Sequence, residues 1–300
     1  MEDVSEGYID VPGGKVWYRE VGEGDETPLL CLHGGPGSTH NNLEALEALA
    51  DRRRVIFYDQ LGCGRSELPD NPALWTIGRF VEELAQVRMA LRLDRLHLFG
   101  SSWGGMLAMQ YVLDRKPRLQ GLILCGSPAS MPRWIADCEE LLAQQPAEVS
   151  KAIRDHEANG FTACPEYQAA LLSVYREHFC RLNPWPVGLE RSFAETGRLV
   201  YYTMNGPSEF SVTGTLKDWD VMDRLGEITV PTLLVGGRYD ECRPSHLEEM
   251  HRRIPSSELA IIEDASHLCF AEQPAEFTTL VNCFLDRTGR GSSLPSAAPR

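Results

Sequence analysis

The sequence predicts an α/β fold, in which a mostly parallel twisted sheet carries helices on both faces and a helical insertion interrupts the alternation. Short apolar runs typical of buried strands alternate with stretches of helical spacing along most of the 300 residues. Between residues 131 and 212 the spacing is helical only, without a buried-strand run. We therefore expect a core of residues 1–128 and 213–288, and a lid of residues 129–212 over the carboxyl edge of the sheet.

The first half of the chain opens with a β-hairpin. Residues 8–11 and 15–18 alternate in polarity around a Pro-Gly-Gly turn at residues 12–14. Strand and helix patterns then take turns. They predict strands over residues 28–32, 54–58, 96–99 and 119–125, and helices over residues 42–50, 76–91 and 105–111.

The alternation resumes after the insertion. Residues 230–235 and 258–262 are apolar runs typical of buried strands, and residues 245–253 and 275–286 have amphipathic helical spacing. Residues 289–300 are rich in Gly, Ser and Pro, which predicts a disordered tail.

Charge and composition exclude several classes of partner. A formal charge of −14 argues against nucleic acid and anionic membranes, and no apolar run reaches the roughly 18 residues of a membrane span. The start lacks the apolar segment of a signal peptide. The nine cysteines include no C-x-x-C pair, so we expect neither disulfides nor a zinc site, but reduced thiols in the cytoplasm. Three lie in apolar runs and are expected to behave as small hydrophobes: Cys31, Cys125 and Cys283.

The most informative motif is Gly-Ser-Ser-Trp-Gly at residues 100–104, which lies between a predicted strand and a predicted helix. This context turns a common G-x-S-x-G pattern into a nucleophile elbow, a sharp turn that exposes the central serine above the edge of the sheet. Small neighbours let the backbone pass, and Gly100 and Gly104 provide that space. Ser102 is therefore the candidate nucleophile.

A serine nucleophile needs a base and a group that orients the base. Asp240 and His267 each follow a different predicted strand, in the chain order Ser, Asp, His. Taken singly, Asp240 is also typical of a turn and His267 of a satisfied histidine, but their common placement at one sheet edge favours catalysis. His33 comes too early in the order, and His246 is expected on a surface helix.

The oxyanion of a tetrahedral intermediate needs backbone N–H donors. One is expected from Trp103, directly after the nucleophile. The other is expected from Gly35, in the His-Gly-Gly-Pro-Gly loop at residues 33–37 that follows a buried strand at the same edge.

Several blocks of this sequence together resemble the signature of the proline iminopeptidase family, across about residues 8–286. They are residues 33–37, 59–66, 100–105, 205–210, 216–220 and 237–241. The family consists of serine peptidases of α/β-hydrolase fold that remove an N-terminal residue, typically proline. The resemblance implies that Ser102, Asp240 and His267 form a catalytic triad. It also implies that Glu209 and Glu241 bind the free α-amino group of the substrate.

We therefore predict a cytoplasmic serine exopeptidase that needs no metal or cofactor and acts on small peptides or aminoacyl amides with a free N-terminus. One alternative keeps the chemistry and changes the substrate, as in an amidase, esterase or lactonase of small acyl compounds. Another is a ligand receptor or scaffold on a hydrolase fold. We expect structural roles for Asp59 and Arg65, and none in catalysis for Cys63 and Cys242.

Overall fold

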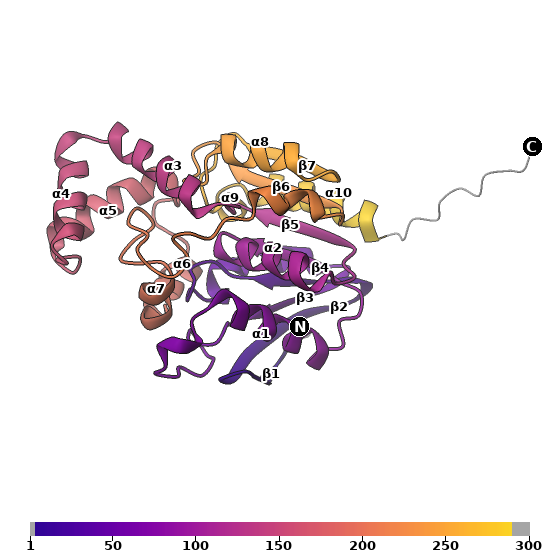
Figure 1. Ribbon diagram of the computed structural model, residues 1–300. Coiled ribbons are helices and arrows are strands. Elements are labelled where there is room, and N and C mark those ends of the chain that lie inside the picture. Colours follow the sequence, from indigo (N-terminus) through magenta and orange to yellow (C-terminus); the bar gives the residue numbers. More distant parts are fainter. Residues whose placement is uncertain (1–3, 290–300) are drawn as a thin grey trace, which may run out of the picture.

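Seven strands form one sheet in the computed structural model, which describes residues 4–289 (Figure 1). The sheet order is β1-β2-β4-β5-β6-β7, and β3 pairs with β2. The strands are β1 (Val4–Val11), β2 (Gly14–Leu32), β3 (Arg53–Tyr58), β4 (His97–Ser101), β5 (Gly121–Cys125), β6 (Thr232–Gly237) and β7 (Ser257–Ile262). From the end of β2 through β4, β5 and β6 to β7 every pairing is parallel, as predicted. Residues 290–300, on which the predicted tail falls, lie outside the described residues.

The N-terminal hairpin is present, with Val11 opposite Gly14. Gly13 has a φ of 101°, which a glycine adopts without strain. The strand predicted over residues 28–32 is not separate, because β2 continues unbroken from the hairpin to Leu32. Val55 of β3 faces both Val21 and Leu29, so the two halves of β2 lie on either side of β3. Irregular register between these halves lets the long strand bend.

Alternating side chains divide the core between the two faces of the sheet. One face packs against α1 (Ile77–Ala90), α2 (Trp103–Arg115) and α8 (Pro244–Arg253). The other packs against α9 (Cys269–Glu272), α10 (Pro274–Gly289) and the 3-10 helix η1 (His40–Leu49). In β4, for example, Leu98 belongs to the first cluster and Phe99 to the second. Helices therefore cover both faces, as the sequence predicts.

The helix expected over residues 42–50 is instead the 3-10 helix η1. The short elements α9, η2 (Pro72–Leu74) and η3 (Met222–Glu227) were not expected, since segments of three to six residues are too short to show a period. No helix of residues 4–289 is long and apolar enough to cross a membrane.

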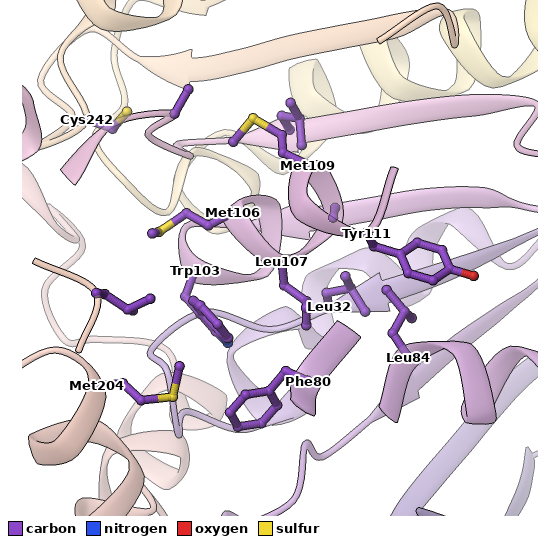
Figure 2. Packing of buried hydrophobic residues seen from close by; sticks show 14 of the residues in the cluster. Leu32, Phe80, Leu84, Trp103, Met106, Leu107, Met109, Tyr111, Met204 and Cys242 are labelled. Carbon is purple, nitrogen blue, oxygen red and sulfur yellow. The ribbon is translucent and has the colours of Figure 1, made fainter. Parts of the chain in front are cut away.

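Five helices between residues 131 and 204 gather at one end of the sheet (Figure 1). They are α3 (Met131–Gln144), α4 (Ala147–Ala158), α5 (Pro165–His178), α6 (Val187–Ala194) and α7 (Arg198–Met204). Met204 of α7 belongs to the same buried cluster as Trp103 of α2 and Phe80 of α1 (Figure 2). The helical group is thus packed onto the core beside the elbow.

All nine cysteines lie within residues 4–289, and none forms a disulfide. Cys31 and Cys125 are buried, as expected for small hydrophobes, but Cys283 is exposed. The prediction for Cys283 was wrong because α10 buries Val281, Phe284 and Leu285 and leaves this position on its outer side.

Candidate active site

Ser102 occupies a strained turn between β4 and α2. Its φ of 54° and ψ of −121° place a non-glycine residue in a region that L-residues rarely adopt. The Ser102 N–H donates to the carbonyl of Cys125 over 2.9 Å and ties the turn to β5. A Cβ on Gly100 would collide with the backbone of Gly104, and a Cβ on Gly104 with the carbonyl of Leu32. The two glycines therefore make the close passage of the backbone possible.

Asp240 and His267 meet in a buried hydrogen bond at the same edge. Asp240 follows β6, His267 follows β7, and His267 Nδ1 donates to Asp240 Oδ1 over 2.7 Å. The same oxygen accepts the N–H of Cys242, also over 2.7 Å. Because the hydrogen bond to Asp240 places a proton on Nδ1, Nε2 is the ring nitrogen left to act as a base.

Ser102 and His267 line one cavity of about 440 Å³, whose other walls include residues of α5, α6 and α7. Within residues 4–289 no hydrogen bond joins Ser102 Oγ to His267 Nε2, and Nε2 lies 3.8 Å from Glu241 Oε1. In the structure Asp240 is hydrogen-bonded to His267, and His267 and Ser102 line the same cavity. Hydrogen bonds between nucleophile and base are often looser before substrate binds.

Residues of the helical group also contact the imidazole ring of His267. Phe179, at the end of α5, stacks on the His267 ring at 5.5 Å between centroids, and Trp134 of α3 meets it edge-on at 6.2 Å. The N–H groups of His267 and Leu268 donate to the carbonyls of His178 and Phe179. These contacts were missed, because nothing in the local sequence of α3 or α5 indicates a histidine 88 or more residues away.

The glycine loop at residues 33–37 runs directly beside the nucleophile. A Cβ on Gly34 would lie 3.3 Å from Ser102 Cβ, and Gly35 lines the same cavity with a φ of 111°. The first residue of α2 is Trp103, whose N–H has no acceptor one turn earlier in the helix. The two predicted oxyanion donors therefore come from segments that flank Ser102.

Gln60 links the glycine loop to the elbow. Its N–H donates to His33 Nε2 over 3.0 Å, its side-chain amide donates to the carbonyl of His33, and its Oε1 accepts from Trp103 Nε1 over 2.8 Å. Burial lowers the pKa of His33 to about 4, so this ring is neutral and acts as a buried acceptor. Gln60 was not singled out, although its place just after β3 puts it at the catalytic edge.

Several other side chains lie where a structural role requires them. Asp59 is buried and accepts from the backbone N–H groups of His40 and Arg65. The prediction that His246 lies on a surface was wrong: its side chain is fully buried, and its Nε2 accepts the N–H of Ala129. Burial raises the pKa of Cys63 and of Cys242, which keeps both thiols protonated.

Two glutamates lie near Asp240 and His267, but only one of them lines the cavity. Glu209 lines the same cavity as Ser102 and His267, and its Oε1 accepts from the hydroxyl of Tyr201 over 2.8 Å. Glu241 is 1% exposed, and neither of its carboxylate oxygens has a hydrogen-bond partner among residues 4–289. Burial raises the pKa of both carboxyls, and their mutual repulsion adds to this effect at Glu241. Two neighbouring carboxylates of this kind are stabilised by an incoming cation.

The three carboxylates also act on His267. Burial alone would lower the pKa of the imidazole, but the charges of Asp240 and Glu241, with a smaller effect of Glu209, outweigh it and raise the pKa to about 10. Without a cation between the glutamates and the ring, His267 therefore holds a second proton at neutral pH. A bound ammonium would release that proton and restore the base.

Comparisons with known proteins identify the family of this chain. The model of the α/β-hydrolase fold family matches residues 27–274, and the chain belongs to this fold family. It is 41% identical over 285 residues to a proline iminopeptidase of Heyndrickxia coagulans, a match that covers 94% of this chain and 99% of the relative. The chain is thus a member of the proline iminopeptidase family.

Solved structures give the same result. The proline iminopeptidase of Mycobacterium smegmatis superposes with a TM-score of 0.88 at 39% identity, over 95% of this chain and 99% of that one. The structure of VinJ superposes with a TM-score of 0.92 at 36% identity, over the same shares of both chains. The likeness therefore extends over the helical group as well as the sheet.

Proposed function

We propose that this protein is a serine exopeptidase that releases an N-terminal residue, preferentially proline, from small peptides through an acyl-enzyme. The observation that carries the proposal is the combination of a strained serine and a buried Asp–His pair with two nearby glutamates, the buried Glu241 and the half-buried Glu209. The first three groups perform acyl transfer, and the glutamates select a substrate with a free amine.

In the proposed reaction Ser102 Oγ attacks the carbonyl carbon of the first residue and passes its proton to His267 Nε2. The N–H groups of Gly35 and Trp103 stabilise the oxyanion of the tetrahedral intermediate. His267 then gives the proton to the leaving amine, and the peptide C–N bond breaks to leave an ester on Ser102. Water, activated by the same histidine, hydrolyses this ester and releases the amino acid. Asp240 orients the imidazole throughout.

The amine is recognised by charge. An ammonium or iminium at Glu209 would donate charge-assisted hydrogen bonds to its carboxylate and offset the cost of removing that charge from water. Glu241 lies behind it, against His267 Nε2, so the same cation would also lower the pKa of the base. Binding of the correct substrate and activation of the nucleophile are therefore linked.

An apolar subsite next to Ser102 supports a compact first residue. A cavity of about 10 Å³ lies between Ser102 and Glu209, and its walls include Trp103, Met131 and Trp134. This volume holds about one water molecule, so a pyrrolidine ring would enter only if the flexible methionine moves aside. A ring of this size fits such a site better than a long or charged side chain.

A substrate panel tests the proposal. Proline p-nitroanilide should be cleaved, N-acetylproline p-nitroanilide should be cleaved at least about a hundredfold more slowly, and the difference should shrink in Glu209→Gln. Equal rates for the free and the acetylated substrate would contradict an amine site. Faster turnover of p-nitrophenyl acetate and other simple esters than of any aminoacyl amide would favour the esterase or amidase alternative.

The partners in this proposal are small peptides or aminoacyl amides with a free N-terminus, in the cytoplasm. The acidic surface and the nine free thiols support that setting.

A further inference from the structure

The cavity of about 440 Å³ beside Ser102 contains an arginine that the proposed reaction does not use. Among its described walls, the side chains with a full acidic or basic charge are Glu209, Arg198 and the imidazole of His267. Arg198 is therefore the one permanent cation that faces this cavity, in a protein of formal charge −14.

Arg198 has no counter-ion of its own. Within residues 4–289 its guanidinium makes no hydrogen bond or ion pair, and the side chain is exposed. Arg191, on the preceding helix, is also exposed but pairs with Glu44 over 3.2 Å. An unpaired guanidinium on a cavity wall keeps its five N–H donors free for a carboxylate.

The position of Arg198 on α7 relates it to the amine site. Tyr201, three residues further along the same helix, donates its hydroxyl to Glu209 over 2.8 Å. Side chains three residues apart on a helix lie on one face, with about 5–6 Å between their Cβ atoms. Arg198 and the tyrosine that holds Glu209 therefore lie on one face of the same short helix, and both line the same cavity.

A short peptide with both ends free carries an ammonium and a carboxylate close together. An extended chain advances about 3.3–3.6 Å per residue, so the α-amino and α-carboxylate groups of a di- or tripeptide are about 6–10 Å apart. The cavity of about 440 Å³ is larger than one amino acid requires, which leaves room for the part of the substrate after the scissile bond.

We infer that Arg198 binds the C-terminal carboxylate of di- and tripeptide substrates, so that the site prefers short peptides with a free carboxyl end over the corresponding amides. The inference rests on the proposed function, since it places the leaving peptide in the same cavity. Without this arginine, the acidic site and the negative net charge would repel a free carboxylate.

The test compares matched peptides and amides. Release of proline is measured from Pro-Gly and Pro-Gly-amide, and from Pro-Gly-Gly and Pro-Gly-Gly-amide, for the wild type and for Arg198→Gln. The ratio of kcat/KM between acid and amide is compared across variants, which cancels the intrinsic reactivity of each substrate. We expect this ratio to fall about three- to tenfold in Arg198→Gln for at least one pair, through KM rather than kcat, as for a partly exposed ion pair remote from the reacting bond.

Arg176→Gln is the control, because Arg176 is also exposed and lies on the neighbouring helix α5, but does not line this cavity. Its acid-to-amide ratios should equal those of the wild type. Ratios that stay within twofold of wild type in Arg198→Gln for both pairs would overturn the inference, while cleavage of proline p-nitroanilide would leave the proposed function intact. Failure of the wild type to cleave any of these proline substrates would overturn both.

Discussion

Removal of the Glu241 charge should lower the pKa of the catalytic base, His267. Glu241 Oε1 lies 3.8 Å from His267 Nε2, and both side chains are buried. Two unit charges at about 4 Å interact by about 4 kcal/mol at an effective dielectric constant of 20, equivalent to about three pH units in a pKa. Burial also raises the pKa of Glu241, which favours its neutral form and weakens this interaction. We therefore expect Glu241→Gln to lower the pKa of His267 by about one to three pH units.

The assay needs a neutral probe that reports the base without using the amine site. The rate at which a small uncharged fluorophosphonate inactivates the enzyme depends on neutral His267, since the imidazole must take the proton of Ser102. In the wild type the rate should rise along an alkaline limb, because the pKa of His267 is raised to about 10. In Glu241→Gln that limb should move toward lower pH.

Glu248→Gln serves as the matched control, since Glu248 is an exposed glutamate on α8 and its loss should leave the limb in place. A limb that stays where it is in Glu241→Gln, or moves toward higher pH, would refute the electrostatic reasoning.

Three further variants test the supports of the site. Asp240→Asn should keep the fold and lower kcat/KM for proline p-nitroanilide by about 10³–10⁴, because an amide does not hold Nδ1–H in place; a loss below tenfold would argue against the orienting role. Gln60→Ala should lower the free energy of unfolding by about 1–3 kcal/mol, since it leaves the buried Trp103 Nε1 without an acceptor, and urea denaturation at constant m would measure this. Gly126→Ala should lower kcat at least about tenfold in a folded protein, because Gly126 has a φ of 54° and a Cβ there would lie 2.9 Å from both Asp240 Oδ2 and His267 Nδ1. If Gly126→Ala had the kcat of the wild type, displacement of the Asp240–His267 pair would not affect catalysis.

Much of the fold follows from local patterns. The apolar runs of β4, β5, β6 and β7 and the helical spacing of α1, α2, α8 and α10 are each contained within one segment, so the chain order of strands and helices was predictable. The elbow was predictable for the same reason, since its strand, turn and helix are contiguous. The continuity of β2 was not, because polar residues 22–28 look like a loop and remain extended only through pairing with a neighbouring strand.

The site was predictable where topology alone brings residues together. Asp240 and His267 each follow a parallel strand, and strand ends meet at one edge. The support of His267 by Phe179 and Trp134 depends on how the helical group packs, which no local signal encodes. The burial of His246 and the exposure of Cys283 were misjudged for a similar reason, because a helical period does not say which side faces the core when both sides carry mixed residues.

The most direct measurement is the kcat/KM of Ser102→Ala for proline p-nitroanilide, with Ser173→Ala, an exposed serine of α5, as the control. We expect Ser102→Ala to lose activity by about 10⁴ or more while Ser173→Ala matches the wild type. Substantial turnover by a correctly folded Ser102→Ala would contradict the assignment of Ser102 as the nucleophile.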